Sequence, residues 1–252
     1  MKVQIEENYQ AMSRRAARRI AREVIGKEET VLALPTGNTP KGTYEELARM
    51  HREELVDFSS VVTFNLDEYY SIDPAHPKSF HSYMKKRVWE PLEIPEEHRY
   101  IPNGSSKDTS RECERYEREI ASRGGIDLAV LGIGQNAHIG FNEPGTAWGR
   151  KTTLVELLPE TVKGEFPNHP DPPTQAITMG IKTIMGAREI LLLASGERKA
   201  RAIQESLEGP VTEDVPGSVL QLHPNISAYL DEAAASGLSE HRSRLSHQKK
   251  ER

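Results

Sequence analysis

Cysteine is nearly absent from this chain, since Cys113 is the only one among 252 residues. No disulfide can close within one chain, and zinc sites built from several cysteines are excluded. No apolar run approaches the roughly 18 residues that span a bilayer, and the first residues contain no apolar signal region. The net charge of -5 provides no basic field for nucleic acid. These absences predict a cytoplasmic globular protein that binds neither nucleic acid nor membrane.

Short apolar segments alternate with amphipathic ones along most of the chain. Residues 9–25 and 41–50 have helical spacing, and Gly26 follows the first of these segments. Strands are expected at residues 31–34, 61–66, 126–131, 189–194, 219–222 and 226–230. This alternation predicts an α/β fold with one doubly wound, mostly parallel sheet and helices on both faces, formed as a single domain by residues 1–238.

Two segments depart from the alternation. Residues 148–173 contain five prolines, which favours an irregular excursion over the surface and makes the segment a candidate lid. Residues 239–252 have one apolar side chain, Leu245, among many charged ones, so we expect a disordered tail.

A turn rich in small and hydroxyl residues follows the strand expected at residues 31–34. Gly37 lets the backbone approach a ligand closely, and Asn38 and Thr39 precede a helix whose free N–H groups and dipole attract anions. The turn lacks the glycine patterns of nucleotide-binding loops, so a monophosphate fits it better. The alternative is an ordinary capped turn with Thr39 as N-cap and Pro40 as the first helical residue.

A second turn of the same kind, residues 195–199, ends in Lys199. A cation in the first turn of a helix is locally unfavourable, and an anionic ligand between the two turns would reverse that penalty. A lysine that points into water is the alternative, because surface lysines are common.

Chemically useful side chains follow two further strands. Asp67 stands where residues 61–66 leave the core, and a general base belongs at that sheet edge, although the residue can also cap a turn. Residues 132–143 combine a glycine turn with His138 and Glu143, which would lie on different faces of a continuous helix. We therefore expect an irregular turn that points both inward, as a catalytic pair. No second histidine stands at metal-ligand spacing, so no metal is expected.

Together these segments resemble glucosamine-6-phosphate deaminase, a family that converts glucosamine 6-phosphate to fructose 6-phosphate and ammonia. The resemblance covers roughly residues 1–233 and rests on five segments in family order: Leu34-Pro-Thr-Gly-Asn-Thr-Pro40, Phe64-Asn-Leu-Asp-Glu-Tyr69, residues 132–144, residues 196–199 and Leu220-Gln-Leu-His-Pro224. The related 6-phosphogluconolactonases carry a different continuation after the histidine.

The resemblance implies roles for individual residues. Asp67 becomes the base that moves a proton from C2 to C1, and His138 moves protons in opening the sugar ring, assisted by Glu143 and Asn136. The phosphate would lie on the remaining candidates, Gly37, Asn38, Thr39 and Lys199. The resemblance implies neither a metal nor an organic cofactor, and self-association into a homo-oligomer is compatible with it.

The chain also departs from the family pattern. Asn136 stands where many members have aspartate, and Ala137 replaces the usual glycine. The arginines of the family's lid are missing, which predicts hyperbolic substrate curves without allosteric control. Three alternatives stay open: a galactosamine-6-phosphate deaminase, a 6-phosphogluconolactonase, and a non-catalytic sugar-phosphate sensor. The presence of Asp67, His138 and Glu143 together favours an enzyme.

Overall fold

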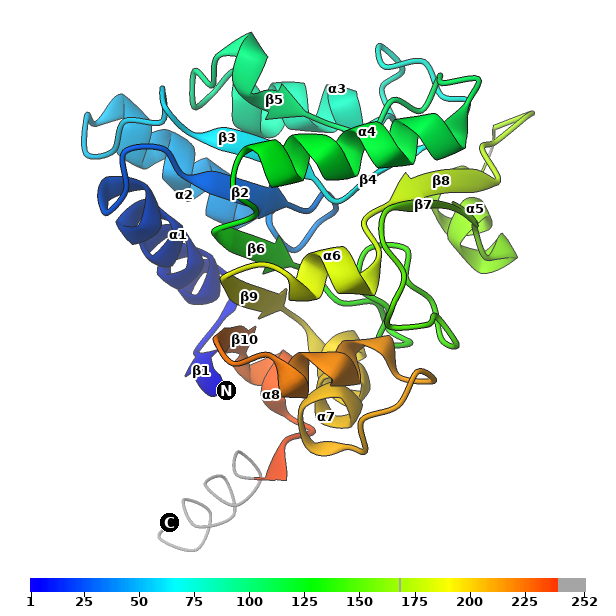
Figure 1. The fold of residues 1–252 in the computed structure, drawn as a ribbon. Coiled ribbons are helices and arrows are strands. Elements are labelled where there is room, and N and C mark those ends of the chain that lie inside the picture. The colour runs from blue at the N-terminus through cyan, green and yellow to red at the C-terminus, as the bar shows by residue number, and fades with distance from the viewer. Residues whose placement is uncertain (168, 240–252) are drawn as a thin grey trace, which may run out of the picture.

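The computed structural model describes residues 1–167 and 169–239 and is built around a seven-stranded sheet (Figure 1). Every neighbouring pair in this sheet is parallel, in the order β1-β10-β9-β6-β2-β3-β5. The strands are β1 (Lys2–Glu6), β2 (Val31–Leu34), β3 (Val62–Asn65), β5 (Arg99–Tyr100), β6 (Leu128–Leu131), β9 (Glu189–Ala194) and β10 (Ile226–Asp231). The predicted fold class is confirmed.

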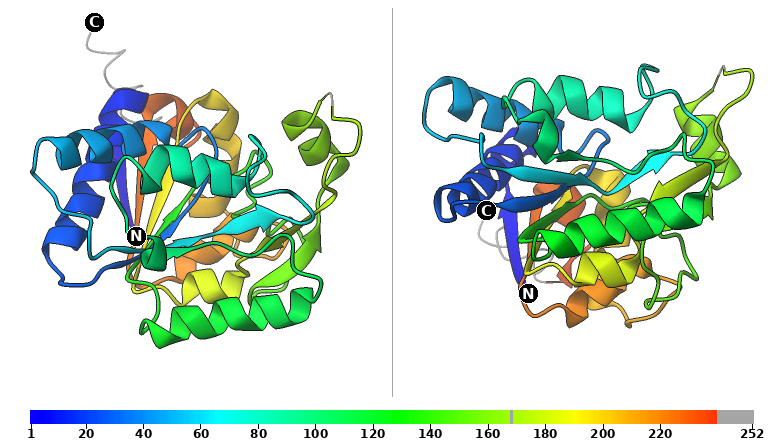
Figure 2. Two further views of the ribbon diagram at one scale, coloured as in Figure 1. Left: turned by 90° about the horizontal axis from the view of Figure 1, so that it is seen from above. Right: turned by 45° about the horizontal axis from the view of Figure 1, so that its top comes forward.

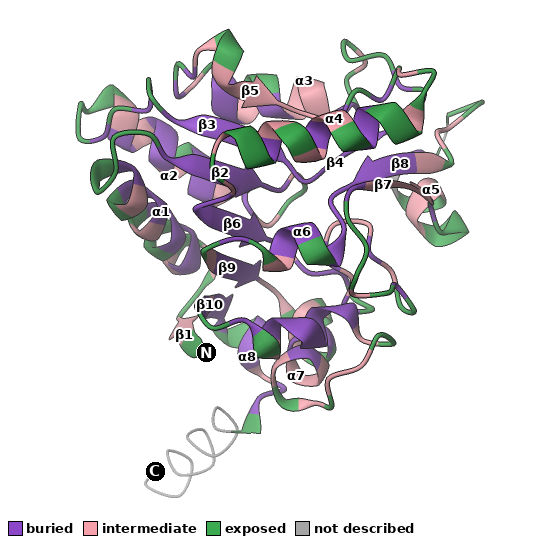
Figure 3. Cartoon of the chain, viewed as in Figure 1, coloured by how far each residue is buried: buried purple, intermediate pink, exposed green. Residues whose placement is uncertain are grey.

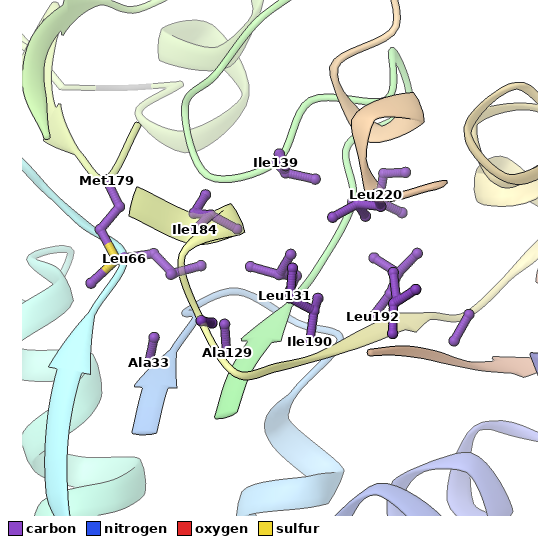
Figure 4. Close-up of a cluster of buried hydrophobic side chains, with 14 of the residues drawn as sticks. Ala33, Leu66, Ala129, Leu131, Ile139, Met179, Ile184, Ile190, Leu192 and Leu220 are labelled. Atoms are coloured by element: carbon purple, nitrogen blue, oxygen red, sulfur yellow. The ribbon is translucent and has the colours of Figure 1, made fainter. Parts of the chain in front are cut away.

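Successive side chains of these strands point to opposite faces, and each face has its own apolar core. Helices α1 (Tyr9–Ile25) and α2 (Lys41–Arg52) cover one face, where Leu32 and Leu34 of β2 are buried. The other face buries Val31 and Ala33 under α4 (Thr109–Ser122), α6 (Ile181–Met185), α7 (Ala200–Glu208) and α8 (Glu232–Ala235). The helical layers lie on either side of the sheet in Figure 2, and Figures 3 and 4 show the buried strands and part of the second core.

Helix α1 shows how the sequence specifies these layers. The side chain of Asn8 accepts a hydrogen bond from the N–H of Ala11, 2.9 Å away, and so caps the first turn. Met12, Ala16 and Ile20 recur on one side of the helix and are fully buried. The helices predicted at residues 9–25 and 41–50 are therefore confirmed, the second with two more residues.

A smaller antiparallel sheet extends the molecule beyond the carboxyl ends of β2 and β3. It consists of β4 (Asp67–Tyr69), β8 (Gln175–Thr178) and β7 (Thr153–Glu156), in that order. Helix α5 (Pro159–Glu165) follows β7 and packs beside this sheet (Figure 1). The expectation of an irregular segment at 148–173 was wrong, because Thr153–Glu156 finds a pairing partner in β8 and the proline at 159 begins a helix instead of breaking one.

The strand expected at residues 219–222 was also wrong. Residues Pro216–Leu222 form a 3₁₀ helix, which begins with a proline whose fixed φ suits the first turn of a helix. Most of the tail expected to be disordered, residues 240–252, lies outside the described residues. Within the described ranges, no helix is both long and apolar enough to cross a membrane.

Candidate active site

A pocket of about 680 Å³ opens at the carboxyl edge of the large sheet. Loop residues after β2, β3, β6 and β9 line it, as the strand-end rule requires for an open α/β sheet. Helix α5 contributes Glu160, Thr161 and Gly164 to the opposite wall. Seven of the eight candidate residues from the sequence lie on the pocket surface: Gly37, Asn38, Thr39, Asp67, Asn136, His138 and Lys199. The eighth, Glu143, lies behind His138.

Asp67 stands where the chain leaves the large sheet and enters the small one. Asp67 is 6% exposed, and no side chain or N–H group among the described residues donates a hydrogen bond to its carboxylate. Burial, and the nearby charge of Glu68, raise the pKa of Asp67 to about 8. A carboxyl group with such a pKa takes up a proton readily near neutral pH.

The neighbouring Glu68 points the other way and has a structural task. Its carboxylate accepts hydrogen bonds from the N–H groups of Phe80 and His81, at 2.9 and 2.8 Å, and from that of Tyr69. Burial raises the pKa of Glu68 to about 7, although these three hydrogen bonds favour the ionised form. Glu68 therefore ties the start of helix α3 (Phe80–Met84) to the strand that carries Asp67.

His138 and Glu143 meet through an irregular turn, as predicted. Nδ1 of His138 lies 3.2 Å from Oε1 of Glu143, and Asn136 donates to the other carboxylate oxygen at 2.7 Å. Burial alone would raise the pKa of Glu143, but the imidazole and the Asn136 amide bring it below its ordinary value. Asn136 thus contacts the carboxylate and not the imidazole ring, so any assistance to His138 passes through Glu143.

Backbone conformation lets this turn close on Asp67. A Cβ atom at Gly134 would lie 2.4 Å from the ring of His138, so only glycine allows the imidazole to pack there. A Cβ at Gly140 would lie 3.6 Å from Oδ2 of Asp67, which shows how near the turn comes to the carboxylate. Ala137 has a φ of 65°, a left-handed conformation that costs about 1–2 kcal/mol without glycine.

The first glycine turn and Lys199 line the same pocket as His138. Gly37 has a φ of 94°, and helix α2 begins after Pro40 without a side-chain cap, so the alternative with Thr39 as N-cap is wrong. Lys199 ends a short 3₁₀ turn, Glu197–Lys199, just ahead of α7. Burial lowers the pKa of Lys199, and no carboxylate of the described residues lies within ion-pair distance of its ammonium group. An anion is the missing partner that this arrangement suits.

Several residues that shape the pocket carried no signal in the sequence. Phe80 and Phe141 line it and stack with their ring centroids 6.1 Å apart, although they are 61 positions apart in sequence. Asp231 accepts from the N–H of Gly196 at 3.0 Å and so holds the turn that carries Lys199. A short spacing rule can find neither contact, because both join segments that are distant in sequence.

Comparisons with known proteins agree with this geometry. The family model for glucosamine-6-phosphate isomerases/6-phosphogluconolactonase matches residues 4–227. The glucosamine-6-phosphate deaminase of Halothermothrix orenii is 48% identical over 239 residues, which cover 94% of this chain and 99% of that protein. That of a Geobacillus species is 49% identical over 232 residues, covering 91% and 92% of the two chains.

Solved structures show the same relationship. A monomeric glucosamine-6-phosphate deaminase superposes with a TM-score of 0.91 at 42% identity, covering 94% of this chain and 100% of that one. The 6-phosphogluconolactonase of Trypanosoma brucei reaches a TM-score of 0.75 at 21% identity, which shows a shared fold alone.

Proposed function

Because this chain belongs to the family of glucosamine-6-phosphate isomerases and 6-phosphogluconolactonases, we propose the activity that its pocket fits best within that family. The protein is a glucosamine-6-phosphate deaminase. It converts glucosamine 6-phosphate and water to fructose 6-phosphate and ammonia, a hydrolysis of the C–N bond at C2. The observation that carries the proposal is that one pocket is lined by a buried carboxylate, a histidine paired with Glu143, and a lysine without an ion-pair partner among the described residues.

The first step is ring opening, and His138 is the group suited to it. The step takes a proton from the C1 hydroxyl and gives one to the ring oxygen, so a single imidazole can serve both atoms in turn. The carboxylate of Glu143 lies beside Nδ1, where its charge would stabilise the imidazolium, and this leaves Nε2 for the substrate. Asn136 holds the second oxygen of Glu143 and so limits its rotation.

The second step moves a proton between carbons, and we assign it to Asp67. The carboxylate removes the C2 proton of the open aldehyde, an enolamine forms, and the proton returns at C1. This leaves C2 as an imine, to which water adds before ammonia departs and the ketone remains. Each positioned acid or base typically contributes about 10²–10⁴-fold in rate.

The phosphate of the substrate would occupy the part of the pocket that is lined by Gly37, Asn38, Thr39 and Lys199. Binding energy gained there is remote from C2, and it serves to orient the reacting carbons against Asp67. The scheme needs no cofactor, and every group in it comes from one chain, so it also needs no partner subunit. We further propose a cytoplasmic location, supported by the free, buried Cys113 as the sole cysteine.

One assay tests the function. Purified protein is incubated separately with glucosamine 6-phosphate, galactosamine 6-phosphate and 6-phosphogluconolactone, and ammonia and ketose phosphate are followed. Ammonia and fructose 6-phosphate from the first substrate are expected. Preference for the galactosamine epimer would change the substrate, lactone hydrolysis without ammonia would replace the activity, and turnover of none of them would favour a sensor.

A further inference from the structure

The loop after β2 is held by tyrosine hydroxyl groups from three different helices. Tyr44 of α2 donates to the carbonyl oxygen of Pro35 at 2.6 Å, and Tyr83 of α3 donates to that of Gly37 at 2.7 Å. Tyr9, the first residue of α1, donates to the carbonyl oxygen of Asn38 at 3.2 Å. None of the three tyrosines lines the pocket, whereas residues 35–40 all do.

These bonds fix which way the peptide groups of the loop point, together with one backbone bond, from the N–H of Lys41 to the carbonyl oxygen of Asn38 at 3.4 Å. In a trans peptide, the carbonyl of one residue and the N–H of the next point in opposite directions. A carbonyl directed at a tyrosine outside the pocket therefore turns the following N–H toward the pocket side. This applies to the N–H groups of Thr36, Asn38 and Thr39. None of them has an acceptor in the part of the chain that the structure describes.

The loop needs such restraint because of Gly37. Gly37 has a φ of 94° and no Cβ atom, so rotation about its Cα–C bond meets little steric resistance, and the peptide between Gly37 and Asn38 can turn over more easily than after any other residue. A turned peptide would present a carbonyl dipole to the ligand in place of an N–H group. That arrangement repels an anion, and the bond from Tyr83 opposes it.

Tyr9 restrains the loop from a second direction. Its hydroxyl oxygen accepts from the N–H of Gly42 at 2.7 Å while its proton goes to the carbonyl oxygen of Asn38. The N–H of Gly42 belongs to the first turn of α2 and therefore has no acceptor within the helix. The hydroxyl of Tyr9 accepts from it and so connects α2 to the loop. A Cβ atom at Gly42 would lie 3.1 Å from Cε1 of Tyr9, so glycine at this position allows the ring to come close.

We propose that the hydroxyl groups of Tyr9, Tyr44 and Tyr83 are positioning groups for the phosphate of the substrate. They turn three carbonyls of the loop away from the pocket and leave three N–H groups to bind the anion. The proposal rests on the assignment of the phosphate to this loop. It adds residues from three helices that touch neither the phosphate nor the reacting carbons.

The test removes one oxygen atom at a time. Tyr9→Phe, Tyr83→Phe and Tyr44→Phe are compared with the wild-type protein, and Tyr100→Phe is the matched control, since its hydroxyl accepts from Arg123 and Tyr100 does not line the pocket. The dissociation constant of inorganic phosphate is measured by calorimetry, and KM and kcat with glucosamine 6-phosphate by ammonia release. Melting temperatures identify variants with a damaged fold, for which the fully buried Tyr44 is the first candidate.

Each of the three variants should bind phosphate about three- to tenfold more weakly, the range expected for one hydrogen bond. KM should rise by a similar factor while kcat falls less, and Tyr100→Phe should match the wild type. Unchanged phosphate affinity in Tyr9→Phe and Tyr83→Phe would overturn the proposal, as would equal weakening in the control. The phosphate titration needs no turnover, so it also distinguishes failure of the loop from failure of the proposed activity.

Discussion

Asp67 and Glu143 bring the same functional group to one pocket from two different surroundings. Asp67 is buried beside another acid and receives no hydrogen bond from the described residues, so its pKa is raised to about 8. Glu143 is partly buried, but it faces an imidazole and an amide donor, and its pKa is lowered. The strand that carries Asp67 thus supplies a carboxyl group that holds a proton near neutral pH, and the turn supplies one that stays ionised.

The difference shows that the groups around each carboxylate set its protonation state, and so its role in the site, whereas the residue type alone does not. A proton acceptor for carbon acid chemistry works best with a pKa near the working pH, whereas a group that supports an imidazolium must keep its charge. Four measurements break or sharpen this contrast.

Removing the proton acceptor should have the largest effect. Asp67→Asn keeps the shape of the side chain and abolishes its basicity, so kcat should fall by at least about 10²-fold while KM changes little. Steady-state ammonia release checks both constants. A variant that turns over near the wild-type rate would remove Asp67 from the proton transfer.

The pH dependence of the wild-type enzyme should show the same group. Asp67 must lose its proton to act as a base, and burial raises its pKa to about 8. The value of kcat/KM should therefore rise with pH below 8, approaching about tenfold per unit beyond the small effect of the substrate phosphate, which titrates near 6. An acidic limb near pH 4 would show that Asp67 has the ordinary carboxylate environment.

Replacing the carboxylate of Glu143 should lower kcat less than replacing that of Asp67. Glu143→Gln keeps a polar group beside Nδ1 of His138 but removes the charge that favours the imidazolium, which we expect to lower kcat about tenfold, or about 1.4 kcal/mol of transition-state stabilisation. Glu160→Gln, an exposed pocket-lining acid on α5, is the control. Equal loss in both variants would point to the overall charge of the pocket and not to the pairing.

The smallest effect concerns stability, and its sign follows from the raised pKa. Between the ordinary value of 3.8 and about 8, the folded state holds a proton on Asp67 that the unfolded state has lost. Stability from this group is complete below pH 3.8 and is lost as pH rises through 8. Asp67→Asn escapes the loss, so its melting temperature should gain steadily on the wild type between pH 5 and 8, by roughly 2–4 °C for each kcal/mol that the wild type loses. A constant difference would contradict the buried, neutral aspartic acid.

Local patterns in the sequence predicted the parts of the fold that depend on neighbours in the chain. The spacing of Met12, Ala16 and Ile20 gave a helix, and the strand-end rule placed Asp67 and Lys199 on one pocket. Pairing of β4 (Asp67–Tyr69) with β8 (Gln175–Thr178) joins segments about a hundred residues apart, and no local pattern in the sequence predicts it. For the same reason, the sequence did not predict the contact of Asp231 with the turn that carries Lys199, or the contacts of the three tyrosines with the loop around Gly37.

Strand β1 has β10 as its neighbour in the sheet, with Lys2 opposite Ser227 and Glu6 opposite Asp231. During synthesis on a ribosome, β1 (Lys2–Glu6) therefore emerges long before its partner β10 (Ile226–Asp231). At about 5–20 residues per second, β1 waits roughly ten seconds or more before it can pair. Until then, the edge of β9 that β10 will cover is also open to other chains. The order of the strands therefore makes completion of the sheet a late step in folding. The hydrogen bond from the N–H of Gly196 to Asp231, which holds the turn that carries Lys199, also forms late.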